Sequence, residues 1–499
     1  MRFSRCSGLV PALCAVAIVP GQTITFASLL PITSVANPKV TLIGDFTGDG
    51  KKDLGVLANA FFVIPGDGFG FFGAPIFSST GGPMVNAAAG DFNEDGLLDF
   101  VCADGAGSIK IMANQGAGTF LELSTYPAGA GARFLALSDF NNDTHLDIAV
   151  AYPSLPLVTR FMGTGTGSFS SGINTSVPIA GTVTSMAIGD MNNDGKQELA
   201  LNYGSSVAFT NWSGPNLVYV STFTTSALAG TIVSAYVDSD LNADIVAASN
   251  STVMSTHRST GGGFIFASSS IIGGNGVATI ANDLNGDGRA EIITGSSSGP
   301  QVFAVQTNGT MLLGSVTSVN ANANPIHIAS GDLTSDGRAD LVTTNTTASV
   351  VSVLVNSMTR TVTCNIALND FIGALGSHQV EYRLKSGTTT INSGLAITSM
   401  SGQITFNTTA FGSYTLSVET SHWLRRQVGI TITNSGASAS FTLPNGDADL
   451  NGEVDAGDID LVISNFGNTG PSNSDLDGTY EVDFADIDIV ISNFGAIDD

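Results

Sequence analysis

The feature that most constrains this chain is a short acidic loop that recurs seven times, each copy followed by an apolar, β-type run. The copies begin at Asp45, Asp91, Asp139, Asp190, Tyr236, Asp283 and Asp332. From one start to the next the spacings are 46, 48, 51, 46, 47 and 49 residues. Self-similarity at such a period predicts a repeat architecture in which each repeat is one supersecondary unit.

The chemistry of these loops is typical of a site for a hard cation. In Asp91–Asp99, oxygen side chains occupy positions 1, 3, 5 and 9, and Gly96 occupies position 6. Calcium takes six to eight oxygen ligands around a tight turn, and glycine reaches the positive φ that the turn needs. The predicted calcium ligands are Asp45, Thr47, Asp49, Asp53, Asp91, Asn93, Asp95, Asp99, Asp139, Asn141, Asp143, Asp147, Asp190, Asn192, Asp194, Glu198, Asp283, Asn285, Asp287, Glu291, Asp332, Thr334, Asp336 and Asp340.

The fifth loop departs from this pattern. Tyr236 replaces the first carboxylate and Leu241 replaces the turn glycine, although Asp238, Asp240 and Asp244 remain. We therefore expect this loop to bind calcium weakly or to stay empty.

Evenly spaced short strands follow each loop, with a Gly-rich turn and an aromatic residue, as in Gly116-Ala-Gly-Thr-Phe120. This repeated order of short strands, Gly-rich turn and aromatic residue predicts the blades of a β-propeller. It resembles FG-GAP (integrin-α-like) repeats, and Phe71-Phe-Gly-Ala-Pro75 carries the Gly-Ala-Pro of that family. The resemblance covers residues 23–359 and implies a seven-bladed propeller. Residues 23–31 look like the end of a repeat without its beginning, so we expect them to complete the last blade.

The net charge of −25 narrows the choice of partners. Of 42 acidic residues, 21 lie at ligand positions of the seven loops and 14 lie in residues 447–499. The negative charge is therefore mostly charge at predicted metal sites. Nucleic acid is disfavoured as a partner because no basic stripe could neutralise phosphates.

The N-terminus predicts a secretory signal over residues 1–22. Arg2 and Arg5 precede an apolar core, Gly8–Val19, that is short for a membrane span, and no other stretch could anchor the chain. We expect a secreted or cell-surface protein of a bacterium. Cys102 and Cys364 lie in different predicted domains, which favours two buried thiols over a disulfide.

Residues 360–444 alternate polar and apolar residues between Gly and Asn turns, as in Gln379-Val-Glu-Tyr-Arg-Leu384. The pattern predicts a small β-sandwich and resembles prealbumin-like or carboxypeptidase-regulatory-like modules. Trp423-Leu-Arg-Arg426 permits two interpretations. Either the tryptophan and arginines form an exposed binding patch, or Trp423 fills the sandwich core and the arginines are solvated.

Residues 445–499 contain a tandem duplication at an offset of 28 residues. Each copy is a twelve-residue loop with EF-hand spacing, followed by an apolar helical stripe. The predicted ligands are Asp447, Asp449, Asn451, Glu453 (through its carbonyl), Asp455 and Asp458 in the first copy and Asp475, Asp477, Asp483 and Asp486 in the second. Tyr480 replaces the turn glycine of the second loop, which predicts a weaker site. The pair resembles a dockerin, which implies docking to a cohesin-like surface partner.

We expect, then, a mainly β protein: a seven-bladed propeller, a small β-sandwich and a small α-helical EF-hand pair. The scattered histidines and the commitment of carboxylates to metal loops disfavour catalysis, so no catalytic residue and no organic cofactor is predicted. The preferred hypothesis is a calcium-binding adhesion or recognition protein that takes an extracellular glycan or protein on its propeller. The alternative is a polysaccharide lyase or hydrolase carried on a propeller with a dockerin.

Overall fold

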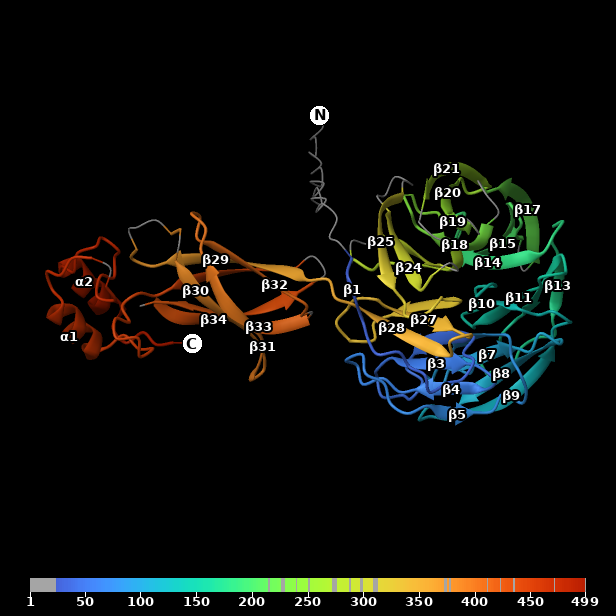
Figure 1. Ribbon diagram of the computed structural model, residues 1–499, viewed down its shortest axis with the longest axis horizontal. Coiled ribbons are helices and arrows are strands. Elements are labelled where there is room, and N and C mark those ends of the chain that lie inside the picture. Colours follow the sequence, from blue (N-terminus) through green and yellow to red (C-terminus); the bar gives the residue numbers. More distant parts are fainter. Residues whose placement is uncertain are drawn as a thin grey trace, which may run out of the picture.

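The structure is a computed structural model that describes residues 24–498 apart from 214–215, 226–228, 239, 250–251, 272–275, 287–288, 297–298, 308–312, 372–374, 377, 411, 422, 434–435 and 471. The expected signal segment and Asp287 of the sixth loop lie outside the described residues. Figure 1 shows a ring of sheets at one end, a two-sheet unit in the middle and two helices at the other end. In the described part of the chain, no helix is long and apolar enough to cross a membrane.

Seven four-stranded antiparallel sheets make up the ring. The first is β2 (Val40–Gly44), β3 (Asp53–Leu57), β4 (Phe61–Ile64) and β5 (Ile76–Ser78), and the second is β6 (Asn86–Gly90), β7 (Asp99–Ala103), β8 (Ser108–Asn114) and β9 (Phe120–Pro127). The third is β10 (Phe134–Ser138), β11 (Asp147–Ala151), β12 (Leu157–Phe161) and β13 (Ile173–Ser176), and the fourth is β14 (Val183–Gly189), β15 (Glu198–Tyr203), β16 (Ser206–Ser213) and β17 (Asn216–Thr224). The fifth is β18 (Ala229–Ala235), β19 (Asp244–Ser249), β20 (Val253–Ser259) and β21 (Phe264–Ile271), and the sixth is β22 (Gly276–Asn282), β23 (Glu291–Ser296), β24 (Gln301–Thr307) and β25 (Leu313–Asn320). The seventh is β26 (His327–Gly331), β27 (Asp340–Asn345), β28 (Val350–Asn356) and β1 (Phe26–Ser28).

The first strands of consecutive sheets contact one another, and the cycle closes where β26 contacts β2. The result is a β-propeller-like ring. Its last sheet combines the two ends of this region, because β1 pairs antiparallel with β28, Phe26 opposite Asn356 and Ser28 opposite Leu354. This pairing confirms the prediction that residues 23–31 complete the last repeat. Because the cycle is closed, each sheet of the ring has a neighbouring sheet on both sides, and none stands at the end of a row.

The second strand of each sheet is the most deeply buried. All residues of β3, β7 and β11 are buried, so these strands read as continuous apolar runs after their first acidic residue. Both faces of such a strand are covered because neighbouring sheets stack face to face. Cys102 lies in β7 and is a free, buried thiol, as is Cys364 in the next unit, which confirms the prediction for both cysteines.

The middle unit consists of two facing sheets. Their strands are β29 (Arg360–Leu368), β32 (Gln403–Thr408) and β35 (Ala437–Leu443) in one, and β30 (Gln379–Ser386), β31 (Thr389–Ile397), β33 (Gly412–Thr420) and β34 (Trp423–Ile432) in the other. A single apolar core between them includes Val362, Leu384 and Trp423. Trp423 is only 3% exposed, so of the two interpretations of the Trp-Leu-Arg-Arg segment, the placement of tryptophan in the core is confirmed.

Two helices, α1 (Ala456–Ser464) and α2 (Phe484–Asn493), follow the two C-terminal acidic loops. Asp455 and Asp483 are their N-caps, each in a capping box completed by an aspartate three residues later. The helices pack over a small core of Val454, Val462 and residues of the second copy. Leu424 of β34 is fully buried in this same core, so the helical unit and the two-sheet unit share apolar packing.

Candidate metal centres

The loops of the ring lie between the first and second strand of each sheet, and their backbones repeat the same turn. In the second loop, the Asp91 carboxylate accepts hydrogen bonds from the N–H groups of Asp95 (3.2 Å) and Gly96 (2.9 Å). Gly96 has φ +87°, and Thr144 holds φ +75° at the same position of the third loop. The turn therefore survives without glycine, at the cost of a strained threonine.

Position 9 has a second role that the sequence did not reveal. Asp99 is fully buried, and its two oxygens accept N–H groups from Phe92 within the loop (3.1 Å) and from Asn114 at the end of the third strand (2.8 Å). Asp340 does the same with Leu333 and Asn356, both at 2.8 Å. The predicted ligand at position 9 is thus also a clamp that joins the loop to its own sheet.

Burial makes these clamps receptive to positive charge. The pKa of Asp99 is raised to about 6 and that of Asp340 to about 7, chiefly by burial and to a smaller extent by the neighbouring loop carboxylates, while the N–H groups that each carboxylate accepts oppose the shift. A cation bound beside such a carboxyl group favours its ionised form and reverses the shift. In the second loop, a bound cation would therefore relieve the repulsion between Asp99 and the carboxylates of Asp91 and Asp95.

Thr47 provides a direct test of whether the first loop fits calcium. Its hydroxyl, predicted as the position 3 ligand, is buried and has no hydrogen-bond partner in the described part of the chain. A buried hydroxyl without a partner costs roughly 1–3 kcal/mol. An ion in the loop would accept this oxygen as a ligand, so the donor set and the unpaired hydroxyl both fit calcium.

The position 3 asparagines lie in the same turn. Asn93 accepts the N–H of Asp95 (3.0 Å) and its amide group donates to the Asp95 carboxylate (3.0 Å). In the sixth loop, the amide of Asn285 donates to Glu291 at 2.8 Å. The described predicted ligands of each loop are thus gathered around one turn, with the fully buried residue of position 9 beneath it.

Three groups of acidic residues bring oxygens within 4.8 Å of one another: Asp238, Asp240 and Asp244 in the fifth loop of the ring, Asp447, Asp449 and Asp458 in the first C-terminal loop, and Asp475, Asp477 and Asp486 in the second. The other described ring loops contain an amide or hydroxyl at position 3 and form no such acidic triplet. The fifth loop is the unexpected member of this set, because its sequence predicted the weakest site.

The C-terminal loops follow the predicted EF-hand spacing. Asp458 and Asp486 are completely buried, and each completes the capping box of its helix, while Asp447 accepts the N–H groups of Asn451 and Gly452, both at 3.0 Å. Burial raises the pKa of Asp447 above its usual range. Gly452 and Tyr480 both have positive φ, +89° and +69°, so the second loop makes the same turn with a residue that resists it.

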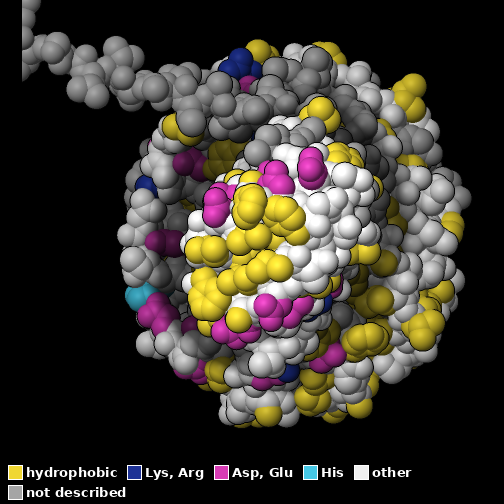
Figure 2. Space-filling model, turned by 90° about the vertical axis from the view of Figure 1, so that its left-hand side faces the viewer, with side chains coloured by type: hydrophobic (Ala, Val, Ile, Leu, Met, Phe, Trp, Pro, Cys, Tyr) yellow, Lys and Arg dark blue, Asp and Glu magenta, His cyan; other side chains and the backbone are white. Residues whose placement is uncertain are grey.

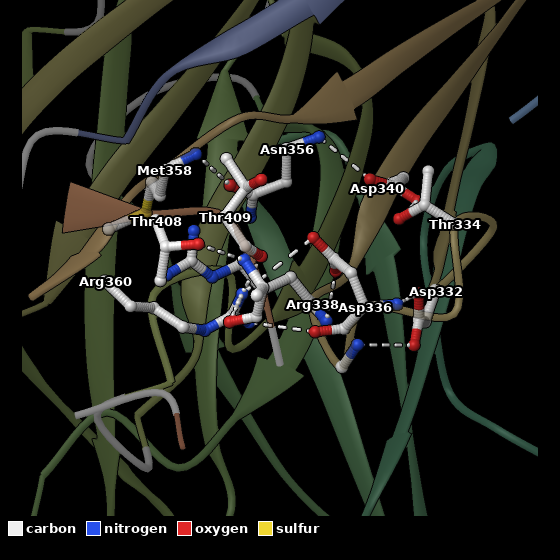
Figure 3. Close-up of polar contacts among 12 residues, drawn as sticks. Asp332, Thr334, Asp336, Arg338, Asp340, Asn356, Met358, Arg360, Thr408 and Thr409 are labelled. Atoms are coloured by element: carbon white, nitrogen blue, oxygen red, sulfur yellow. Dashed lines mark hydrogen bonds and ion pairs between the residues drawn. The ribbon is translucent and has the colours of Figure 1, made fainter. Parts of the chain in front are cut away.

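Figure 3 shows that the seventh ring loop is also a joint between two parts of the molecule. Arg360, the first residue of β29, is fully buried and donates to the carbonyl of Asp336 (2.9 Å) and to that of Thr409 (2.7 Å). Arg338 lies beside it, 2% exposed, with a guanidinium group that has no hydrogen-bond partner among the described residues. Burial and then the charge of Arg360 lower the pKa of Arg338 to about 10. Loop, ring and two-sheet unit therefore meet at one charged cluster.

A second joint links the two-sheet unit to the helices. Arg425 of β34 donates its N–H to Asp498 (2.7 Å), and its guanidinium group pairs with the same carboxylate (3.3 Å). Arg426 donates to the Ile497 carbonyl (2.8 Å). The prediction that these arginines are merely solvated is therefore wrong, because they hold the C-terminal segment. The sequence analysis missed this contact, and Leu424 beside the two arginines is buried against the helices.

The FG-GAP-like repeat family matches residues 45–102, 91–150, 139–201 and 283–343. Each match begins at the first residue of an acidic loop, and together they contain every loop but the fifth. The chain therefore carries FG-GAP-like repeats, as its motifs predicted. None of the curated proteins compared with the chain matches it.

Solved structures with similar shapes are distant in sequence. One is BBS1N in complex with ARL6DN (13% identity, 66% of this chain and 97% of that chain, TM-score 0.49). Another is an Agrocybe aegerita lectin that recognises non-reducing terminal N-acetylglucosamine (18% identity, 62% and 86%, TM-score 0.44). A third is a cohesin–X-dockerin complex from Acetivibrio cellulolyticus (18% identity, 28% and 97%, TM-score 0.23). With every TM-score below 0.5, the fold follows from the strand pairings themselves.

Proposed function

We propose that this protein is a secreted, non-catalytic, calcium-binding recognition protein of the bacterial surface. Its parts are a seven-bladed FG-GAP-type propeller (residues 23–359), a prealbumin-like β-sandwich (360–444) and a dockerin-like EF-hand pair (445–499). The observation that carries the proposal is that the acidic loops and a wide cavity lie at opposite ends of the ring. The acidic loops occupy the ends of the inner strands, and a wide funnel occupies their beginnings.

The funnel has a volume of about 860 Å³, which suits a ligand of a few sugar rings or a short peptide. Its described lining contains no Asp or Glu, in a chain that has 42 acidic residues. Lys39 and Arg133 line it, and neither pairs with a carboxylate in the described part of the chain. Hydroxyls of Thr184 and Thr231 alternate with apolar side chains. Such a lining favours a hydroxylated ligand that carries negative charge, such as an acidic glycan.

The hydrolase form of the alternative finds less support at this site. Glycoside hydrolysis uses a pair of carboxyl groups on either side of the scissile bond. The described funnel lining offers hydroxyls, an amide and cations, but no such pair. We therefore assign binding rather than hydrolysis to the funnel.

The helical end supports the proposed attachment role. Figure 2 shows hydrophobic side chains gathered on this end of the molecule, with acidic side chains on either side. Exposed apolar residues of this segment include Ile463, Phe466, Tyr480, Phe484, Ile491 and Phe494. Phe466 and Phe484 lie against each other, with ring centroids 4.9 Å apart. An exposed apolar patch with a polar rim is typical of a protein–protein interface, which fits a cohesin-like partner.

The proposal predicts about six calcium ions in the propeller. Six loops have complete sets of oxygen ligands and the fifth does not. Metal analysis by mass spectrometry of the full chain, after removal of free ions, should find these six in addition to those of the C-terminal loops. Two or fewer ions per chain would contradict the proposal.

The ligand prediction concerns the funnel cations. Replacing Lys39 and Arg133 together with alanine should weaken binding of the best acidic glycan on an array at least about tenfold, because both unpaired charges lie on the same rim. Lys52→Ala is the matched control, since Lys52 is exposed in a calcium loop at the other end of the ring. Equal binding by both variants would place the ligand elsewhere, and an array without any binder would contradict the recognition role.

A further inference from the structure

The fifth loop of the ring combines two features that ought to exclude each other. Tyr236 replaces the first ligand and is 51% exposed, which predicts an empty site. Yet Asp238, Asp240 and Asp244 bring their oxygens within 4.8 Å of one another, an arrangement whose mutual repulsion a nearby positive charge would relieve. Position 3 is aspartate only in this loop of the ring, so the fifth loop has kept three acids by a different choice of positions.

The positive charge beside the carboxylates of the fifth loop comes from an arginine of the chain itself. Arg258 on β20 places its Nε 2.9 Å from Asp238 Oδ2 and its Nη2 3.2 Å from Asp240 Oδ2. Although the Arg258 side chain is half exposed, Asp238 beneath it is only 8% exposed. The guanidinium group therefore bridges the two loop carboxylates from the outer side of the sheet.

Aligning the third strands by the residue that donates to position 9 shows that four other blades have no arginine at the place of Arg258. The N–H of Ser259 binds the position 9 clamp, Asp244, at 2.9 Å, just as Asn114 and Asn356 bind theirs. The residue before this donor is Arg258 in the fifth blade, but Pro65, Ala113, Met162 and Val355 stand there in the first, second, third and seventh blades. A side chain at this place faces position 3, because Met162 Sδ contacts the Asn141 amide at 3.9 Å.

Every carboxylate oxygen of the fifth loop has a donor from the chain. The two oxygens of Asp238 accept from the Asp240 N–H (2.8 Å) and from Arg258. Those of Asp240 accept from the Asn242 N–H (2.9 Å) and from Arg258 (3.2 Å). Those of Asp244 accept from Val237 (3.2 Å) and Ser259 (2.9 Å). The oxygens of Asp91, Asp95 and Asp99 in the second loop also have chain donors, but all of those donors are neutral, so the charged donor is what distinguishes the fifth loop.

We propose that the guanidinium group of Arg258 is the permanent cation of the fifth loop and takes the place that calcium has in the other blades. A guanidinium group forms two directed hydrogen bonds to neighbouring carboxylates, which suits the loop once Tyr236 has removed the first ligand. Calcium at this place would have to displace the arginine and would then lack one carboxylate. The loop of the fifth blade is therefore held to the third strand of its sheet whether or not calcium is present. This inference rests on the proposed calcium binding of the other loops.

Calcium counting with matched variants tests the inference on the full chain. Asp95→Asn in the second loop should lower the number of bound ions by one, whereas Asp238→Asn in the fifth should leave it unchanged. The triple variant Tyr236→Asp/Leu241→Gly/Arg258→Met restores the ligand and the turn and removes the cation, so it should bind one ion more than the wild type. A loss of one ion with Asp238→Asn would overturn the inference alone. A wild-type chain without bound calcium would overturn both the inference and the proposed function.

Thermal unfolding gives a second readout if the triple variant does not fold. Arg258→Met should lower Tm by the same amount in calcium and in chelator, because the lost interaction involves no ion. Asp95→Ala, in contrast, should lower Tm only in calcium. A shift for Arg258→Met that appears only when calcium is present would contradict the assignment.

Discussion

In chelator, the two C-terminal helices are expected to lose their hydrogen-exchange protection almost completely while the β-sheets of the two-sheet unit keep theirs. Residues 445–499 carry 14 acidic and no basic residues, and within them Asp447, Asp449 and Asp458 lie within 4.8 Å. Repulsion among these charges opposes the compact loop, and the apolar core is too small to offset chain entropy. Under the proposed function, calcium would neutralise the loops and fix the helix starts, which would couple metal binding to folding.

The two loops should contribute unequally. Asp447→Ala is expected to reduce protection of α1 and α2 more than Asp475→Ala, because Gly452 adopts φ +89° freely while Tyr480 holds +69° under strain. Tyr480→Gly is the matched variant: it should tighten calcium binding by the second loop, since the tyrosine is 64% exposed and its removal loses little packing. Hydrogen exchange followed by mass spectrometry on the full chain keeps Leu424 in place beneath the helices. Helices that stay protected in chelator, or a greater effect at Asp475, would contradict this account.

The second large effect is expected at a residue that the sequence presents as an ordinary ligand. Asp99→Ala should destabilise the ring by about 4 kcal/mol, because the buried N–H groups of Phe92 and Asn114 both lose their acceptor, at roughly 1–3 kcal/mol each, and a small cavity adds to this. Since these bonds exist between chain atoms, most of the loss should persist in chelator. Denaturant unfolding in calcium and in chelator measures it.

Asp95→Ala is the control for Asp99→Ala. Asp95 lies on the exposed side of the same turn and accepts the N–H of Leu97 (2.9 Å). Its loss should lower stability in calcium, where ligand binding adds to the free energy of unfolding by mass action, and have little effect in chelator. If the two variants behaved alike in both conditions, the clamp assigned to position 9 would be wrong.

The sequence predicted what depends on local pattern. Loop spacing, the strands after each loop, the completion of the last sheet by β1, the buried thiols and the core position of Trp423 all follow from periodicity and turn chemistry. What it missed depends on register between distant segments. The partner of Asp99 is an N–H 15 residues further on, and Arg258 follows Tyr236 by a whole hairpin. Aligning the blades by their third strands would have exposed Arg258, because the other blades compared have no charged residue there.

The contacts between units were missed for the same physical reason. Leu424 and Arg425 alternate along one strand like any other half-buried pair, and only the folded chain shows that the opposite face is covered by the helices. Arg360 likewise looks like the start of an ordinary strand. Its burial comes from two loops, at Asp336 and at Thr409, that the sequence separates by more than 70 residues.

The joint at Arg360 has a mechanical consequence. In a protein held by its helical end while its ring grips a ligand, tension enters the ring through residues 357–359, which continue β28. That strand is flanked on both sides, by β27 and β1, so a pull along it loads two rows of crosswise hydrogen bonds at once. The last residue of the strand, Asn356, is bonded to the Asp340 clamp. The seventh acidic loop therefore lies where the force arrives, and under the proposed function an ion bound there would raise the load that the ring bears before it opens.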